Sequence, residues 1–473
     1  MEPTTRSFVA NAKKAIADEN LHTALSKLTR GFPVKRLDAM ARLPEFEQLR
    51  DDAKAIKDHT LANLDAYLER YEEKARDNGA HVHWAVDGED ARNIILKICR
   101  DAGARTVTKG KSMITEEIGV NEHLEANGIQ PIETDLGEYI IQLRKEPPSH
   151  IIAPAIHLSK EQVAEAFVDE HTDLPVDRDL TEPRALLEEA RAILRRKFLA
   201  ADVGITGANM LIAETGTSVI VTNEGNGDLT QTLPKTHIVV ASIEKVVPTL
   251  EDATTILRVL ARSATGQEMS VYTTFSTGPR RPDDLDGPEN YHVVILDNER
   301  SSMLGGEFND MLRCIKCGAC LNHCPVYKAI GGHAYGWCYS GPMGAVLIPG
   351  MLGLAEAHDL PQASTFCGRC EDVCPMRIPL PRMLRSWRNK AFETGHVTTK
   401  SRAGLSVWSF LARRPGFYRP TMKIVVAVLG FFGRLGGKGR FSFLPLAGDW
   451  TAARDLPAPE GKTFIEQWKR GER

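Results

Sequence analysis

The chain is organised around the stretch Cys314-Ile-Lys-Cys317-Gly-Ala-Cys320-Leu-Asn-His-Cys324-Pro325. Its spacing, Cys-x2-Cys-x2-Cys-x3-Cys-Pro, is that of ferredoxins with two iron–sulfur clusters, in which the fourth cysteine binds the other cluster. Short spacers let three thiolates surround one face of a cluster. Pro325 turns the chain away, because proline has no amide hydrogen with which to continue a helix. The stretch therefore predicts electron-transfer chemistry.

A second cysteine motif, Cys367-Gly-Arg-Cys370-Glu-Asp-Val-Cys374-Pro375, follows downstream. In a two-cluster arrangement, three cysteines of one motif share a cluster with the last cysteine of the other. Two Cys-x2-Cys pairs also build closed zinc sites, but the cysteines of these motifs exceed what one such site needs. We therefore expect cluster one to use Cys314, Cys317, Cys320 and Cys374, and cluster two to use Cys324, Cys367 and Cys370.

Cluster two lacks a fourth cysteine. The position that the spacing predicts for it is occupied by Ser364. Three arrangements remain open. Ser364 or an exogenous ligand completes a [4Fe–4S] cluster, or the site holds [3Fe–4S] on three thiolates. In the third arrangement Cys338 folds back as the fourth ligand, although no short-spaced partner and no following proline support it.

Composition narrows the class of protein. A length of 473 residues predicts two to four domains, and a net charge of −3 gives no electrostatic case for nucleic acid. Of nine cysteines, eight lie between residues 314 and 374, which is typical of metal ligands rather than of a disulfide framework. No signal peptide is recognised at the start, and the apolar run 424–432 is too short to span a bilayer. We expect a cytoplasmic protein whose membrane contact is at most peripheral.

The hydrophobic pattern divides the chain into four segments. Residues 1–75 are expected to be helical, and 76–300 to form an α/β domain with a mostly parallel sheet. Residues 301–395 form the cysteine domain, and 396–473 a basic C-terminal extension. Within the second segment the predicted strands are 81–85, 105–108, 210–213, 218–222 and 237–242, and the Gly- and Pro-rich residues 266–290 are predicted to be an exposed loop.

Two further features of the α/β segment are local. Ser159-Lys-Glu-Gln162 has the pattern of a capping box at the start of a helix. Cys99 lies on the apolar face of a predicted helix, so we expect a buried core thiol rather than a ligand.

Anion-binding candidates lie at predicted strand ends. Lys109-Gly-Lys-Ser112 resembles the end of a phosphate-binding loop, but the glycine that a Walker motif needs is Arg105, so nucleotide hydrolysis is not expected. Lys109 or Lys111 and the backbone amides remain candidate contacts for an anion. Asp135 and Glu214 are further polar candidates, because a ligand crevice forms at the strand ends of a parallel sheet.

Each polar residue near the cysteines can be interpreted either as an ordinary surface residue or as a functional one. His323 is expected to be a solvated loop residue, with cluster tuning as the alternative. A solvated basic face is expected for the arginines after the second motif, with docking of an acidic electron-transfer partner as the alternative; these are Arg377, Arg382, Arg385 and Arg388.

Taken together, the chain resembles the lactate utilization protein B family over nearly its whole length. The central stretches that carry the resemblance are those of the lactate-utilization (LUD) domain, and the cysteine motifs follow in the family's order. They are Thr108-Lys-Gly-Lys-Ser-Met113, Glu133-Thr-Asp-Leu-Gly-Glu138 and Ala213-Glu-Thr-Gly-Thr-Ser218. The cysteine motifs alone are shared with many ferredoxin-like carriers.

The resemblance implies an LUD-like α/β domain, similar to sugar-phosphate isomerase and CoA-transferase folds, with N-terminal helices and an α-helical ferredoxin-like domain. It implies two [4Fe–4S] clusters on the seven motif cysteines. The implied partners are a protein with cysteine-rich repeats, a smaller LUD protein and an unidentified electron acceptor, with no nucleic acid. It assigns no catalytic residue in the LUD domain.

Two functions follow as hypotheses. In the first, the chain is the electron-transfer subunit of an oxidoreductase complex that oxidises L-lactate to pyruvate for growth on lactate, rather than a stand-alone enzyme. In the second, the LUD domain itself catalyses a reaction on a small anionic substrate and the clusters serve it.

Overall fold

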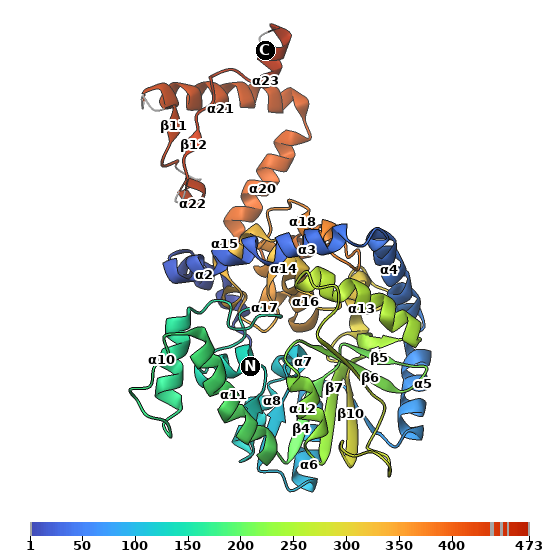
Figure 1. Ribbon diagram of the computed structural model, residues 1–473. Helices are drawn as coiled ribbons and strands as arrows, with labels where there is room; N and C mark the ends of the chain where they lie inside the picture. Colours follow the sequence, from blue (N-terminus) through green and yellow to red (C-terminus); the bar gives the residue numbers. More distant parts are fainter. Residues whose placement is uncertain (1, 436–438, 445–447, 452–453, 472–473) are drawn as a thin grey trace. The chain divides into compact units, whose positions relative to one another are not determined.

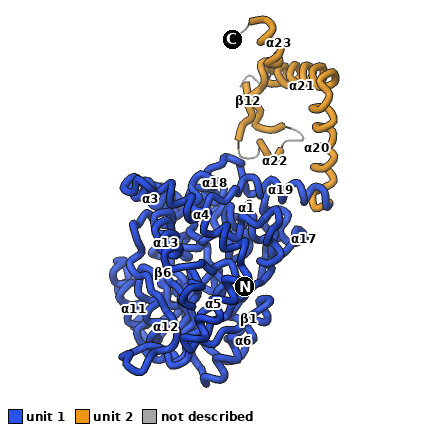
Figure 2. Tube along the Cα trace, turned by 90° about the vertical axis from the view of Figure 1, so that its right-hand side faces the viewer, with its two compact units in different colours: residues 1–394 blue, residues 395–473 orange. Residues whose placement is uncertain are grey.

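The structure is a computed structural model that describes residues 2–435, 439–444, 448–451 and 454–471. The chain forms two compact units, residues 1–394 and 395–473 (Figure 2). The first unit contains the α/β domain, the cysteine motifs and the N-terminal helices.

The centre of the first unit is a six-stranded sheet in which every neighbouring pair is parallel. Both faces are covered, as parallel sheets require. Ile238 and Val240 face α6 (Gly88–Asp101) and α8 (Val120–Ala126), whereas Val239 and Ala241 face α5 (Leu64–Asp77) (Figure 1). The strand order is β1 (His81–Ala85), β10 (Asn290–Leu296), β7 (Thr236–Ser242), β4 (Val203–Gly207), β2 (Thr106–Lys109) and β3 (Gln130–Glu133).

The predicted α/β fold is confirmed, with two corrections. The predicted strands 210–213 and 218–222 do not join the parallel sheet. They are β5 (Met210–Ile212) and β6 (Thr217–Thr222) of a separate four-stranded sheet, completed by β8 (Val246–Val247) and β9 (Tyr272–Ser276). The segment 266–290 is therefore not all loop, because its Tyr-Thr-Thr-Phe-Ser stretch has strong strand propensity and pairs antiparallel with β6.

Helices complete the α/β region, and two local predictions about them are confirmed. The capping box at Ser159 is present, at the start of α10 (Lys160–Glu170). Cys99 is buried in the core between α6 and the sheet, as expected. The remaining helices here are α7 (Met113–Glu117), α9 (Leu136–Leu143), α11 (Pro183–Ala200), α12 (Asn226–Thr232) and α13 (Leu250–Ala264).

The N-terminal helices divide between two partners. Whereas α5 packs on the sheet, the earlier helices share one core with the cysteine domain, in which Leu25 and Phe46 lie with Tyr327 and Tyr335. Residues 300 positions apart therefore form one hydrophobic cluster. These helices are α1 (Phe8–Ile16), α2 (Glu19–Arg30), α3 (Phe32–Ala41) and α4 (Phe46–Ala62).

The cysteine domain consists of short helices joined by tight turns. The longest, α19 (Leu380–Glu393), packs through Trp387 on α16 (Gly341–Leu352), whose Val346 carbonyl accepts the indole N–H. The first motif contains α14 (Ala319–Asn322) and the second contains α18 (Arg369–Asp372), whereas α15 (Pro325–Ile330) and α17 (Leu354–Ala357) come between these two helices in the chain.

The second unit contains α20 (Thr399–Ala412) and α21 (Pro415–Leu435), with the short elements β11 (Arg440–Phe441), α22 (Gly448–Thr451), β12 (Leu456–Pro457) and α23 (Phe464–Lys469). Gly430 and Gly433 let α21 approach residues 458–461, where a Cβ would collide with Gly461 or Ala458. Over the described residues, the longest and most apolar helices still fall short of what a membrane crossing requires. Parts of the predicted basic extension, 436–438, 445–447, 452–453 and 472–473, lie outside the described residues.

A buried arginine connects the α/β domain to the segment that leads into the first motif. The Arg300 guanidinium donates to both Glu117 oxygens, at 2.6 and 2.9 Å, and lies 3.0 Å from Glu244 Oε2. Burial alone would raise the pKa of Glu244, but Arg300, Lys316 and Lys245 offset this and lower it to about 2. The three buried groups therefore depend on one another for their charge.

We expect Arg300→Met to lower the free energy of unfolding by about 3–5 kcal/mol, because it leaves two buried carboxylates without their cation. Urea unfolding followed by tryptophan fluorescence measures the loss. Arg42→Met, which breaks the exposed pair with Glu268, is the control and should change stability by less than about 1 kcal/mol. Equal midpoints for the two variants would contradict this interpretation of the Arg300 cluster.

Candidate functional site

The two cysteine motifs have the same backbone conformation. Lys316 and Gly318, on either side of Cys317, have φ angles of 55° and 72°. Phe366 and Gly368, on either side of Cys367, have φ angles of 55° and 82°. Each pair of left-handed residues is followed by one helical turn, α14 or α18. The motifs are thus two copies of one loop conformation.

The loops bring four cysteines from both motifs around one cavity. Its walls include apolar side chains, among them Ile315, Met343 and Ile378. Among the described residues, no group of three or more His, Cys, Asp and Glu side chains is close enough to hold a single metal ion. The cysteines that line this cavity are Cys314, Cys317, Cys320 and Cys374.

The other three cysteines form a second group. Burial raises the pKa of Cys370 to about 12, and the neighbouring Cys324 and Cys367 add to the shift. Cys367 is exposed, so this group lies near the surface of its unit. Cys320 faces both groups: its pKa is raised by burial and then by Cys314, Cys317, Cys370 and Cys374. The two groups of cysteines are therefore neighbours.

Backbone amides donate to the sulfur atoms. The distances are 3.4 Å from Lys316 N to Cys314 Sγ, and 3.5 Å from Tyr327 N to Cys324 Sγ and from Ile378 N to Cys374 Sγ. Such bonds orient thiolate ligands and stabilise their charge. Without metal the thiols keep their protons, because burial raises the pKa of Cys317 to about 12 and that of Cys374 to about 11. Metal binding here must therefore displace protons.

Ser364 has the same local geometry as a ligand cysteine. Phe366 N donates to Ser364 Oγ at 3.1 Å, just as Lys316 N donates to Cys314 Sγ at 3.4 Å. The hydroxyl thus stands in the repeat where Cys314 stands in the first loop. Cys338 lies elsewhere: it is buried, and the charged groups that most affect its thiol are Glu117, Glu116 and Lys316.

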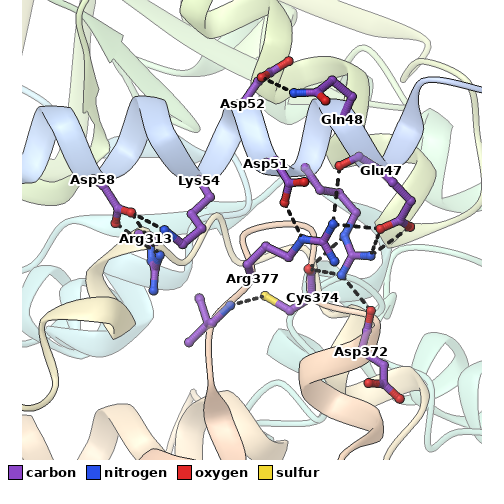
Figure 3. Close-up of polar contacts among 12 residues, drawn as sticks. Glu47, Gln48, Asp51, Asp52, Lys54, Asp58, Arg313, Asp372, Cys374 and Arg377 are labelled. Atoms are coloured by element: carbon purple, nitrogen blue, oxygen red, sulfur yellow. Dashed lines mark hydrogen bonds and ion pairs between the residues drawn. The ribbon is translucent and has the colours of Figure 1, made fainter.

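Helix α4 holds the second motif in place (Figure 3). The Arg50 guanidinium is buried and donates to the carbonyl oxygens of Asp372 at 2.7 Å and Cys374 at 2.8 Å. From α3, Arg36 donates to the Val373 carbonyl at 3.1 Å. These carbonyls lie at and just beyond the C-terminal end of α18, where the helix dipole favours a cation. The N-terminal helices therefore fix the loop that carries Cys374.

The predicted basic residues are mostly engaged within the unit. Arg377 pairs with Glu47 and Asp51 at 2.9 Å each (Figure 3), and Arg388 lies over the Phe366 ring and donates to the Ser364 carbonyl. Arg385 also lies over Phe366, while Arg382 pairs with Asp310 and stays exposed. All four arginines remain at least partly exposed, as the predicted solvated face requires, and acidic or aromatic neighbours contact each of them.

His323 is not the solvated residue expected from sequence. Its Nδ1 lies 2.8 Å from the Ala319 carbonyl oxygen, and its Nε2 is buried without a hydrogen-bond partner among the described residues. Burial lowers the pKa of His323, so the ring is held neutral beside the first motif.

A second candidate site is a cavity of about 280 Å³ at the carboxyl ends of the parallel strands. From β2 the chain continues to β3 at one edge of the sheet, whereas from β4 it continues in the opposite direction to β7. The cavity therefore lies between β2 and β4, where the strand order reverses. Ligands bind at such switch points in open α/β sheets. The segments that follow these strands line it, namely 110–114, Asp135, 207–209 and Ser242.

The structure sorts the predicted anion contacts. Lys111 and Asp135 line the cavity, as expected. Lys109 does not, because its buried ammonium is already paired with Glu116 at 2.6 Å and Glu133 at 2.7 Å. Glu214 instead accepts the Leu250 amide at 3.3 Å, at the start of α13. Lys245 and Lys316 also line the cavity, although neither was predicted from the sequence. Lys245 follows the end of a predicted strand and Lys316 lies inside the first motif, and these positions could have indicated them.

Comparison with known proteins identifies both regions. A family model described as LUD domain matches residues 68–296, and one described as 4Fe-4S dicluster domain matches residues 310–378. The chain therefore carries two iron–sulfur clusters, and the zinc interpretation is set aside. The donor set fits this assignment, because seven cysteines gather in two adjoining groups with amide N–H groups directed at their sulfur atoms.

Curated relatives match nearly the whole chain. Lactate utilization protein B of Bacillus subtilis is 41% identical over 98% of this chain and 96% of its own length, as is that of Bacillus licheniformis. An uncharacterized electron transport protein of Escherichia coli, YkgF, is 41% identical over 99% of this chain and 98% of its own length. A solved DUF162 family protein from Deinococcus radiodurans aligns with a TM-score of 0.28 and 17% identity over 49% of this chain and 98% of its own, too low a similarity to support an argument.

We expect Arg50→Met to loosen the Cys374 loop and to speed iron loss to a chelator by about tenfold or more, because buried hydrogen bonds from a charged group stabilise by about 1.5–3 kcal/mol. Anaerobic release of iron to a coloured chelator measures this rate. Lys54→Met, on the same helix with the same change of charge, removes only a half-exposed pair with Asp58 and should release iron as the wild type does. Equal rates for the two variants would show that Arg50 does not hold the site.

Proposed function

Because the chain belongs to the lactate utilization protein B family, we propose that it is an iron–sulfur electron-transfer subunit of a complex that oxidises L-lactate to pyruvate. This oxidation releases two electrons and two protons, and a two-cluster subunit takes up the electrons one at a time. The observation that carries the proposal is the neighbouring position of the two cysteine groups, since α14, which carries Cys320, packs against α18, which carries Cys370. Electrons then need cross only a short gap.

The ligands follow from the grouping. We assign Cys314, Cys317, Cys320 and Cys374 to cluster one, and Cys324, Cys367 and Cys370 to cluster two, with Ser364 at its fourth position. When bound, the clusters supply one-electron redox chemistry. The chain's own residues orient the thiolates: amides at 316, 327 and 378 donate to sulfur, and Arg50 and Arg36 hold the Cys374 loop. Apolar side chains, among them Ile315, Met343 and Ile378, line the space around the first group.

The complex would place this subunit between a lactate-oxidising partner and an electron acceptor in the cytoplasm. We propose the other lactate-utilization subunits as partners: a protein with cysteine-rich repeats and a smaller LUD protein. The exposed Cys367 supports docking near the second group, because a partner's redox centre can approach closely there.

A second candidate function is catalysis by the LUD domain on a small anionic substrate, with the clusters serving it. The cavity at the strand ends favours it, because Lys111 lies there. Glu214 does not support catalysis by the LUD domain, because its carboxylate accepts the Leu250 amide at the start of α13.

Deletion of the protein should abolish growth on L-lactate in a strain that lacks other lactate dehydrogenases. Wild-type protein should restore growth, whereas Cys314→Ala and Cys367→Ala should not, because each removes a ligand of a different cluster. Cys99→Ala, in the core far from the motifs in sequence, is the matched control and should restore growth. Unimpaired growth of the deletion strain, or rescue by both ligand variants, would refute electron transfer as the role.

Ser364→Ala should remove the fourth ligand of cluster two, and the protein should then lose one iron per chain on mild oxidation. The expected signature is a three-iron EPR signal that the wild type lacks under the same treatment. Ser364→Cys should retain this iron more firmly than the wild type, because a thiolate is a stronger ligand for iron than a hydroxyl. Identical iron content and spectra in all three proteins would exclude Ser364 as a ligand.

A further inference from the structure

The cavity at the strand ends contains a buried lysine that no carboxylate of the described residues pairs with. Lys245 lines this cavity and is 9% exposed. Within the described ranges, no hydrogen bond or ion pair reaches its ammonium group; Glu244 and Cys314 act on it only from a distance. A buried ammonium is costly unless it is paired, and burial, followed by the charge of Lys316, lowers the pKa of Lys245 to about 7. This lysine therefore favours a negatively charged group in the cavity.

The neighbouring carboxylates are already engaged. Glu117 and Glu244 both pair with Arg300, and Glu117 also accepts the Tyr339 hydroxyl. Lys316 donates to that same hydroxyl at 2.8 Å and adds a second positive charge at this end of the cavity. The local charge therefore remains in excess on the lysine side.

The other end of the cavity carries hydrogen-bonding groups of both signs. Asp135 accepts the Gly137 and Glu138 amides through Oδ1. Glu224 lies beside it, and burial, followed by the charge of Asp135, raises the pKa of Glu224. Lys111 completes this end. These groups suit a hydroxyl or carbonyl oxygen rather than a second full charge.

The cavity adjoins the first group of cysteines without an intervening layer. Ile315, Lys316 and Cys317 form part of its wall and also part of the wall of the space enclosed by Cys314, Cys317, Cys320 and Cys374. A molecule in the cavity would therefore lie against the loop that carries these ligands. Its volume of about 280 Å³ is near the lower end of ligand cavities, about 300–1,000 Å³, so the ligand is small.

We propose that this cavity binds a short carboxylate of the 2-hydroxy or 2-oxo acid class, with its carboxylate on Lys245 and its second oxygen toward Asp135, Glu224 and Lys111. The choice of acid rests on the proposed function. The site itself rests on the cavity and its unpaired lysine. The rival explanation is that Lys245 and Lys316 serve only to balance the negative charge of the neighbouring cluster.

Calorimetric titration of the anaerobically purified full chain, with both clusters present, tests the proposal. The probes are L-lactate, pyruvate, propionate and inorganic phosphate. L-Lactate or pyruvate should bind saturably, and propionate, which lacks the second oxygen, more weakly. Binding of neither acid, or of phosphate alone, would overturn the proposal and leave the charge-balancing role.

Lys245→Met should weaken binding of the acid by about tenfold or more, which is the usual effect of losing a charge-assisted hydrogen bond. Lys97→Met, on the exposed face of α6, is the control and should bind as the wild type does. If Lys245→Met fails to assemble its clusters, Lys111→Met is the deciding variant, because Lys111 also lines the cavity. Weaker binding of the acid by Lys111→Met supports the site, and unchanged binding overturns it. Where Lys245→Met does assemble, unchanged binding likewise overturns it.

EPR separates a bound ligand near the cluster from binding elsewhere. The acid should alter the spectrum of the reduced wild type, and the same change in Lys245→Met should require about tenfold more acid or more; an unaltered wild-type spectrum would place any binding outside the cavity. Failure of the inference and failure of the proposed function are distinguishable. Absence of binding in a protein whose deletion abolishes growth on lactate refutes only the cavity, whereas binding in a protein that is dispensable for growth refutes only the electron-transfer role.

Discussion

The ion pairs of buried Arg300 are the interaction on which the arrangement of the first unit depends. Glu117 lies at the end of α7 and Glu244 just after β7, so one guanidinium joins two strand-end segments of the sheet to the chain that enters the first motif. The network continues through Tyr339 to Lys316, inside that motif. Burying any of these charged groups without its partner costs several kcal/mol of stability, by the usual magnitude of about 3–5 kcal/mol. The network therefore fixes the position of the cysteine loop against the sheet.

Close backbone contacts also hold the cysteine domain against the α/β domain. A Cβ on Gly332 would lie 1.7 Å from the Ser149 carbonyl oxygen, and one on Gly318 would lie 2.7 Å from Ile152. His150, from the same loop, bonds to Asn322 between the cysteines at 2.9 Å. The loop after α9 is therefore pressed onto the first motif. This contact is what makes the strand-end cavity and the first group of cysteines share a wall.

Some of the site was predictable because its chemistry depends on short sequence separations. The spacing of the motifs predicts the curled loops, and the gap at Ser364 is visible by aligning one motif with the other. Partnerships across the fold were not predictable. Lys109 and Lys111 are equivalent in a sequence pattern, but only the first meets Glu116 and Glu133. The partner of Glu214, the Leu250 amide at the start of α13, was likewise not predictable. Neither was the burial of the His323 Nε2 atom.

The sequence by itself determined the α/β class, the grouping of the motif cysteines and an iron–sulfur region with one missing thiol, since periodicity and ligand spacing are local properties. Tertiary structure alone decided which strands form the parallel sheet, that α3 and α4 hold the Cys374 loop, and that Lys245 faces a cavity beside the first motif. The physical reason is that burial and charge pairing are set by residues hundreds of positions apart, whose proximity no local pattern encodes.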